Sequence, residues 1–345
     1  MDPISQGAVG AAFAQTAARR DQLRAYAIFG ALAGMAPDLD VLIQSSTDPL
    51  LFLEYHRHFT HALIFIPIGA LIVCGALFKL WRHPLTFRQA YIACLLGYAT
   101  HGLLDACTSY GTQLLWPFSD VRIAWNNVSV IDPLATVPLL ILLIIAARRR
   151  STRYVFAGVI WLLVYLLLGV VQNDRAMDAA RSAAQQRGHQ PERLTVKPGF
   201  ANLILWKSIY EHAGRYYVDA VRVTGQAQFC PGTSIAKLQP QRDLPYLQPG
   251  SQQARDLERF RWFSDDYLAV FEQPTFIIDI RYATVPNDIY PLWGIHMNPA
   301  ADADDHVRFE STPRATPEQT AALSALLLGN GCEPIRNQKP WEQRQ

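Results

Sequence analysis

Apolar and polar residues divide the chain into two unlike halves. Residues 25–171 are largely apolar, whereas residues 172–345 have the charged and polar content of a water-soluble domain. Two uncharged runs, residues 62–78 and 154–171, are long enough to cross a bilayer as helices. Three further segments are apolar but shorter or interrupted by polar residues: residues 25–43, 89–104 and 134–147. We therefore predict a mainly α-helical, polytopic membrane domain at residues 1–173, with about five membrane segments. A soluble all-helical core is the alternative, but it would not need two uncharged runs of near-spanning length.

Basic residues cluster between these segments in a way that predicts their orientation. Five segments that alternate in direction place all three clusters on one side of the membrane, which the positive-inside rule assigns to the cytoplasm. The N-terminus is then expected inside, and residues 174–345 are expected outside as an extracytoplasmic domain. The clusters consist of Arg19, Arg20 and Arg24; of Lys79, Arg82 and Arg88; and of Arg148, Arg149, Arg150 and Arg153.

The polar half contains stretches in which apolar and polar residues alternate, which is typical of β-strands. The clearest such stretches are residues 215–223, 267–273 and 275–285. Residues 316–330 predict a helix, with Thr316 as its N-cap and Gly329 as its stop. Residues 172–190 predict a polar helix that leaves the membrane. The second half is therefore expected to be a soluble α+β domain.

Composition excludes two classes of protein. The net charge of +2 is too small for a nucleic-acid-binding protein, and no stretch interleaves basic and aromatic residues. Five cysteines without a CxxC pair form neither a disulfide scaffold nor a cysteine-based zinc site. Cys230 and Cys332 both lie in the polar half, where an oxidising compartment would allow them to form a disulfide.

Side chains that bind metals gather in four short motifs of the apolar half. The four-residue spacing of His101 and Asp105 puts both on one face of a helix, one turn apart. Pro37 disfavours helix, and in an extended segment Asp38 and Asp40 would face one cavity. Thr60 is expected to cap a helix that begins at His61, with His56 in the preceding loop. The motifs are "APDLD" with Asp38 and Asp40, "HRHFTH" with His56, His58 and His61, "HGLLD" with His101 and Asp105, and "WNNVSVIDP" with Trp125, Asn126, Asn127 and Asp132.

The predicted topology brings these four motifs to the same depth at the outer face of the membrane. An aspartate inside an apolar segment is costly unless it has a partner, so two of them beside several histidines favour a metal site. Histidine and aspartate without cysteine suit zinc first, and also manganese or another divalent ion. Plainer interpretations exist for single residues, since His58 could be interfacial and the pair His101 and Asp105 could be structural.

On these residues the chain resembles the YdjM-like family of inner-membrane proteins, which are regarded as metal-dependent hydrolases. The matching pieces are "MDPISQGAVGAA", "GALAGMAPDLDVLI", "HRHFTHALIF" and the stretch from His101 to Leu134, and they lie within about the first 145 residues. A looser likeness continues through residues 203–223 and 259–270. The resemblance implies a protein of the bacterial inner membrane with a divalent metal ion bound by His56, His61, His101, Asp105, Asp38 and Asp40.

Two positions depart from that family pattern. His58 stands where the family usually has a small residue, so it is not expected to bind the metal. Gln6 stands where some members have a histidine, which removes the expectation of a ligand there.

The resemblance and the residues together lead to an expected activity, a membrane-bound metal-dependent hydrolase. Its metal would activate a water molecule, with Asp38 or Asp40 as an alternative general base. Arg57 and Arg122 are candidates to hold an anionic substrate, because guanidinium matches phosphate. The HxxxD element is also similar to that of zinc-dependent phospholipases C and P1-type nucleases. Together with a site at headgroup depth, this favours a lipid or lipid-linked phosphoester as substrate.

Two other classes of function compete with the hydrolase. The chain could be a non-enzymatic membrane scaffold or regulator, whose outer domain binds a partner and whose histidines hold a structural ion. Metal transport is a third class, but the inner halves of the predicted segments offer almost no ionisable residue for a path.

Overall fold

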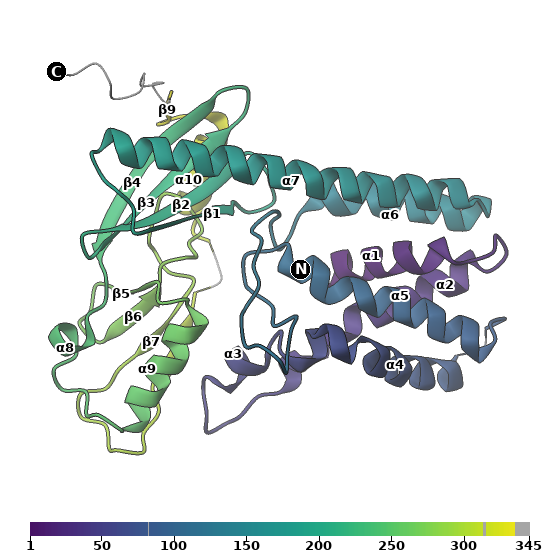
Figure 1. Cartoon of the computed structure of the whole chain (residues 1–345), viewed down its shortest axis with the longest axis horizontal. Coiled ribbons are helices and arrows are strands. Elements are labelled where there is room, and N and C mark those ends of the chain that lie inside the picture. The colour runs from purple at the N-terminus through teal and green to yellow at the C-terminus, as the bar shows by residue number, and fades with distance from the viewer. Residues whose placement is uncertain (82, 313–314, 335–345) are drawn as a thin grey trace. The chain divides into compact units, whose positions relative to one another are not determined.

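The structure is a computed structural model that describes residues 1–81, 83–312 and 315–334 (Figure 1). It divides into two compact units. The first comprises residues 1–170 and the short segment 200–202, and the second comprises residues 171–199 and the chain from residue 203 onward. The sequence prediction placed this boundary between residues 173 and 174. Arg82, from the second predicted basic cluster, lies outside the described residues.

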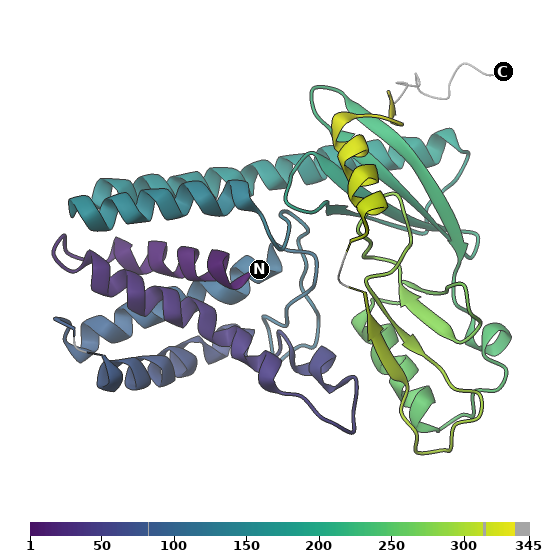
Figure 2. The same ribbon diagram turned by 180° about the vertical axis from the view of Figure 1, so that it is seen from behind.

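The first unit is helical. Its long helices lie roughly side by side along the horizontal axis of the view, and consecutive long helices are antiparallel (Figures 1 and 2). In order they are α1 (Pro3–Thr16), α2 (Leu23–Met35), η1 (Ala36–Leu42), α3 (Leu51–Tyr55), η2 (Phe59–His61), η3 (Leu63–Phe65), α4 (Ile66–Leu80), α5 (Phe87–Ala106), α6 (Pro133–Arg149) and the first part of α7 (Thr152–Gln186). The η elements are short 3-10 helices.

Helices α1, α2 and α5 pack backbone against backbone through glycines. A methyl group on Gly10 would lie 2.4 Å from the carbonyl oxygen of Gly30, and one on Gly97 would lie 2.2 Å from the same oxygen. Small residues allow this close approach of helices, as they do in membrane proteins. The three helices therefore keep a fixed spacing, and residues on them can meet across the bundle.

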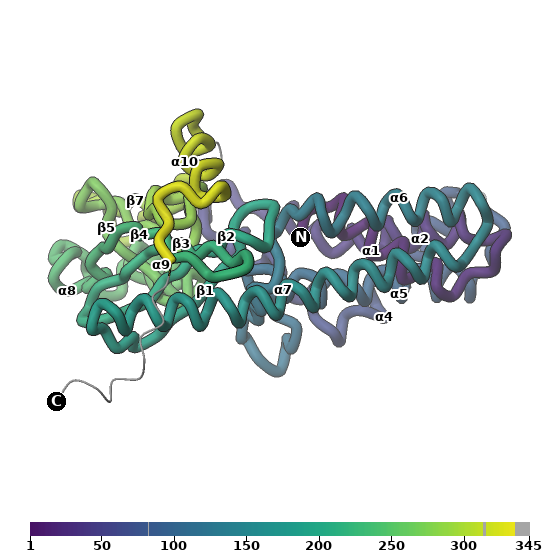
Figure 3. Tube along the Cα trace, turned by 90° about the horizontal axis from the view of Figure 1, so that it is seen from above, coloured from purple at the N-terminus to yellow at the C-terminus, as the bar shows by residue number. Residues whose placement is uncertain are grey.

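Helices α6 and α7 pack side by side within the first unit (Figure 3). A methyl group on Gly158 would lie 3.0 Å from Leu139, and Trp161 donates a hydrogen bond to the carbonyl of Ala135. Asp132 caps α6 and accepts hydrogen bonds from the Tyr165 hydroxyl at 2.8 and 2.9 Å. The last of the four predicted motifs thus contributes a helix cap here.

The prediction of five membrane segments is not supported. Three segments are long and apolar enough to cross a membrane by length and composition: Leu23–Leu42, Leu63–Leu80 and Thr152–Gln186. The other two predicted segments form helices of a different character. Helix α6 has only 17 residues and ends in Arg148 and Arg149. Helix α5 has 20 residues, but it is packed among α1, α2 and α4, so it can carry small and polar residues that a lipid-facing helix would not.

Helix α1 was not predicted, and its direction corrects one expectation. Its glycines and alanines form no apolar stripe, so periodicity did not reveal it. Asp2 caps it by accepting hydrogen bonds from the backbone N–H groups of Ile4 and Ser5. The helix begins beside the start of α6, where Ser5 contacts Thr136, and Arg19 and Arg20 follow its far end. The start of α1 therefore lies at the opposite end of the bundle from the basic residues, rather than among them.

The second unit is rich in β-structure, as predicted. One antiparallel sheet has the order β1-β2-β3-β4-β9 and the other has the order β5-β6-β7-β8. The strands are β1 (Arg193–Pro198), β2 (Leu205–His212), β3 (Arg215–Val223), β4 (Ala227–Ala236), β5 (Leu268–Val270), β6 (Phe276–Asp279), β7 (Trp293–His296), β8 (Arg308–Ser311) and β9 (Glu333–Pro334). The helices are α8 (Pro240–Asp243), α9 (Gln252–Phe263) and α10 (Pro317–Leu328).

Several local predictions for this unit are confirmed. Thr316 caps α10 in a reciprocal capping box, and Gly329 ends the helix with a φ of 89°. Cys230 and Cys332 form a disulfide that joins β4 to the segment before β9. Helix α7 continues to Gln186 without a break, close to the predicted end of the polar helix.

Two buried lysines face each other in the first sheet. Lys197 on β1 is the register partner of Lys207 on β2, and both side chains are almost completely buried. Lys207 donates hydrogen bonds to the carbonyls of Pro286 and Asp288, and the Lys197 ammonium lies 5.3 Å from the Tyr282 ring centre. Burial lowers the pKa of each lysine to about 7, because the charged form is poorly solvated there.

We expect the free energy of unfolding to rise as the pH is raised from about 7 to about 10. In this window the unfolded chain binds protons that the two buried lysines do not, so each lysine contributes up to about 1.4 kcal/mol per pH unit. Urea unfolding of the full chain in detergent, followed by tryptophan fluorescence at several pH values, measures this slope. The double variant Lys197→Met, Lys207→Met should have a flatter profile, and an unchanged profile would contradict the assignment.

Candidate metal centre

The six predicted ligands come together at one end of the helical unit. Asp38 and Asp40 lie on η1, which follows α2 directly, and His56 follows the short helix α3. His61 ends η2, and His101 and Asp105 lie on the last turns of α5. Segments that are far apart in the sequence thus supply one cluster of carboxylates and imidazoles.

Four of these residues direct one donor atom each toward a common point. The Nε2 atoms of His61 and His101 are 2.8 Å apart. Asp38 Oδ1 lies 3.5 Å from Nε2 of His61 and 3.4 Å from Nε2 of His101. Asp105 Oδ2 lies 3.2 Å from Nε2 of His61 and 3.6 Å from Nε2 of His101. A tetrahedral ion with ligands at ~2.0–2.1 Å keeps them roughly 3.3–3.4 Å apart, so this donor set fits a divalent metal such as zinc.

The hydrogen bonds behind the two imidazoles support the same conclusion. His101 Nδ1 lies 2.5 Å from the carbonyl oxygen of Gly34, to which it can only donate. His61 Nδ1 lies 3.2 Å from a carboxylate oxygen of Asp40 and 3.0 Å from the Thr60 hydroxyl. With both Nδ1 atoms protonated, each neutral ring presents a lone pair at Nε2. Two lone pairs and two carboxylate oxygens that converge repel one another unless a cation lies between them.

Asp40 contributes to the cluster in a different way. One of its oxygens accepts a hydrogen bond from His56 Nδ1 at 2.8 Å. The other accepts from the backbone N–H of Arg57 at 2.9 Å and from the Thr60 hydroxyl at 3.0 Å. Asp40 is therefore well suited to orient the loop and its histidines. Its donor atoms also lie within 4.8 Å of those of Asp38 and His56, so Asp38 belongs to two possible groups of ligands.

Two local predictions at this site are wrong. Residues 36–42 form a 3-10 helix and not an extended segment. Pro37 lies in the first turn, where a backbone N–H would have no acceptor within the helix, so its missing N–H removes no hydrogen bond. Thr60 does not cap a helix that begins at His61, because α4 begins at Ile66 and the Thr60 hydroxyl donates to Asp40 instead. The aspartates still reach the cluster, because η1 brings Asp38 close to His61 on η2 and to His101 and Asp105 on α5.

The two arginines proposed to hold substrate lie in different surroundings. Arg57 is buried, with its Nε 3.1 Å from Asp105 Oδ2, and it donates to the Thr108 hydroxyl at 2.9 Å. Arg122 donates to the backbone carbonyls of Leu53, Tyr110 and Gly111. Arg57 therefore adjoins the cluster, whereas Arg122 ties together the loops that surround it.

Other residues near the cluster clarify its limits. His58 is absent from both ligand groups, and its ring contacts those of Tyr55 and Trp116. Partial burial lowers the pKa of His58, which favours its neutral form. His58 was not among the metal ligands expected from the sequence, and its position in the structure is consistent with that prediction.

No ligand was expected at Gln6 from the sequence, and its contact with the cluster was not predicted. Gln6 lies on α1, and its side-chain amide donates to Asp105 Oδ1 at 2.9 Å. The amino group of Met1 contacts the same oxygen. The signal was present, because Gln6 is a polar residue with a long side chain directly before a run of small and apolar residues in α1.

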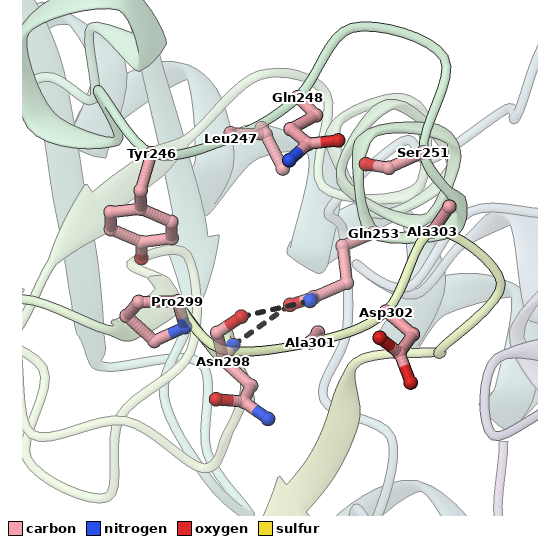
Figure 4. A pocket seen from close by; sticks show the side chains of 10 residues that line it. All are labelled: Tyr246, Leu247, Gln248, Ser251, Gln253, Asn298, Pro299, Ala301, Asp302 and Ala303. Atoms are coloured by element: carbon pink, nitrogen blue, oxygen red, sulfur yellow. Dashed lines mark hydrogen bonds between the residues drawn. The ribbon is translucent and has the colours of Figure 1, made fainter.

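The second unit has a pocket of a different kind (Figure 4). Tyr246, Gln248, Asn298 and Asp302 are among the side chains that line it. Asp302 is the one acidic side chain among the lining residues, which include no histidine or cysteine. The pocket can form hydrogen bonds, but it has no set of metal ligands comparable with the cluster in the helical unit.

Comparison with known proteins agrees with the geometry of the first unit. The family described as "YdjM inner membrane protein" matches residues 1–176, which is just over half of the chain. "Uncharacterized protein YfhP" of Bacillus subtilis (strain 168) is 29% identical over 115 residues, which cover 33% of this chain and 35% of that protein. The chain therefore spans about a third of this curated relative, and no solved structure matches significantly. The residues that build the cluster all lie in the matched region, and the chain belongs to the YdjM family of inner membrane proteins.

Proposed function

We propose that the chain is a metal-dependent hydrolase of the inner membrane that acts on a lipid or lipid-linked phosphoester at the outer face. The observation that carries this proposal is the convergence of Asp38, His61, His101 and Asp105 on one point. Both imidazoles are fixed by hydrogen bonds at their far nitrogens, so their near nitrogens are available to an ion. Zinc suits this set best, and manganese is the next candidate.

The exposure of the ligands indicates where substrate would approach. His61, His101 and Asp105 are fully buried, whereas the Asp38 side chain is 19% exposed. His56, beside it, is 21% exposed. An ion bound here would lower the pKa of a water molecule and polarise the scissile group. The side of the cluster formed by Asp38 and His56 is the open side, on which water and substrate would meet.

The remaining charged residues take supporting roles. Asp40 accepts hydrogen bonds at both oxygens, which favours orientation of His56 and His61 over proton abstraction. Arg57 supplies a buried positive charge beside Asp105, which favours an anionic substrate. Arg122 donates hydrogen bonds to backbone carbonyls, so we propose that it stabilises the surrounding loops. Of the two arginines, Arg57 is then the one that we propose contacts substrate.

A lipid substrate is supported by the short helix η1. This helix ends the candidate membrane segment Leu23–Leu42, and its aspartates alternate with apolar residues. Leu39 is 64% exposed and Leu42 is 74% exposed, whereas Asp40 is buried. The same turn would therefore face lipid on one side and the cluster on the other, an arrangement that would bring a headgroup phosphate close to the ligands.

The competing function is a membrane scaffold or regulator with a structural metal ion. The deep burial of three ligands agrees with that alternative, because structural ions have closed coordination shells. The partly exposed side at Asp38 and His56 favours the hydrolase. Activity on a phosphoester distinguishes the two.

Removal of one ligand should release the metal. We expect His61→Ala and Asp105→Ala to bind zinc at least about tenfold more weakly than the unchanged protein, because each removes a converging donor. Metal content of the proteins purified in detergent measures this. His58→Ala is the matched control from the same "HRHFTH" stretch and should keep its metal. Full occupancy in both ligand variants would disprove the site.

Hydrolysis should depend on the same ion. We expect the purified protein to release phosphate or a phosphorylated headgroup from vesicles that contain phospholipids or lipid-linked phosphates. A chelator should abolish the release, and zinc or manganese should restore it. If the metal-loaded protein cleaves none of these phosphoesters, the structural-ion alternative is the correct one.

The proposed orientation can be tested separately. Three membrane segments, like five, place the second unit on the side opposite to Arg19 and Arg20, and the disulfide between Cys230 and Cys332 suits an oxidising compartment. We expect alkaline phosphatase fused after Gln345 to be active and a green fluorescent protein at the same position to be dark. The reverse pattern would contradict an extracytoplasmic second unit.

A further inference from the structure

Gln6 is a fully buried polar residue of α1, whose other buried residues are glycine, alanine and valine apart from Ser5 and Gln15. A carboxamide in such surroundings is costly unless its groups are hydrogen-bonded. Its Nε2 atom lies 2.9 Å from Asp105 Oδ1 and 3.4 Å from the backbone carbonyl oxygen of His101. Both contacts are to residues that supply metal ligands, and both are to acceptors. Exchange of the amide oxygen and nitrogen would set an oxygen against a carboxylate, so the orientation of the amide is determined.

The contact divides the two oxygens of Asp105 between two tasks. Oδ1 receives the amide of Gln6 and also contacts the amino group of Met1. Oδ2 faces the Nε2 atoms of His61 and His101 and the guanidinium of Arg57. Oδ2 of Asp105 is therefore available to coordinate an ion, while Oδ1 is fixed by hydrogen bonds on the side away from the ion.

The oxygen of the Gln6 amide makes no hydrogen bond among the described residues. Within residues 1–81, 83–312 and 315–334, Oε1 is buried and has no hydrogen-bond partner. A methionine of similar length would fill the same space without this unsatisfied oxygen. Stability alone therefore does not explain a glutamine here.

We propose that Gln6 is a positioning residue of the metal centre, which fixes Asp105 so that a single oxygen, Oδ2, faces the ion. This inference rests on the proposed metal site. Residues behind a ligand orient it and tune its basicity, and their loss typically lowers metal affinity by about 10–100-fold.

Gln15 provides a matched control on the same helix. It too is fully buried, and its Nε2 donates one hydrogen bond to a backbone carbonyl, that of Leu23, at 3.0 Å. Its Oε1 also has no partner in the part of the chain that the structure describes. It differs from Gln6 in contacting no residue of the cluster, so Gln15→Met reproduces the change in packing without the change in positioning.

The test is the zinc affinity of the full chain in detergent, measured by competition with a chelator of known affinity. We expect Gln6→Met to bind zinc about 10–100-fold more weakly and Gln15→Met to bind it within about twofold of the unchanged protein. If Gln6→Met is not recovered folded, Gln6→Asn serves in its place, because its amide is one methylene too short to reach Asp105.

Each result leads to a different conclusion. Equal affinity of Gln6→Met and the unchanged protein would overturn the positioning role and leave the metal site intact. Equal losses in Gln6→Met and Gln15→Met would also overturn it, because the effect would then come from the packing of α1. Failure of the unchanged protein to bind zinc or manganese would overturn the metal site itself, and the role of Gln6 with it.

Discussion

The close approach of α1, α2 and α5 is the constraint on which the cluster depends. Gly10, Gly30 and Gly97 meet with no room for a side chain between the backbones. This spacing lets the carbonyl of Gly34 on α2 reach His101 on α5, and lets Gln6 on α1 reach Asp105. Helices separated by ordinary side chains would hold these residues too far apart, so the orientation of the ligands follows from backbone contact.

Three carboxylates close together would be unstable in a largely apolar bundle without compensation. Asp40 is compensated within the protein by donors from the loop that contains His56, Arg57 and Thr60. The negative charge of Asp105 is partly compensated by the guanidinium of Arg57 near Oδ2 and by the hydrogen bond from Gln6 to Oδ1. Among the hydrogen bonds of the described residues, the carboxylate of Asp38 accepts none of this kind, and no donor faces the Nε2 atoms of His61 and His101. A cation fits at the point where these atoms converge.

Much of this arrangement followed from local patterns. The spacing of His101 and Asp105 predicted one helical face, and both lie on α5 as expected. The cap at Thr316 and the stop at Gly329 were also predicted, because capping depends on a few neighbouring residues. The predicted number of five membrane segments is not supported, because this number depends on more than a few neighbouring residues. The character of α5 depends on which helices surround it, and a hydropathy pattern does not contain that information.

The sequence by itself determined the division into an apolar and a polar half, the types of ligand available, and the end of the bundle at which they gather. These properties depend on composition and spacing along the chain. The tertiary structure decided which atoms converge, which nitrogen of each histidine is available, and which of two neighbouring aspartates orients the loop. It also revealed Gln6, whose role depends on a contact between residues 99 positions apart. Such contacts depend on how the helices pack, and the partner of a residue cannot be predicted from the local sequence around it.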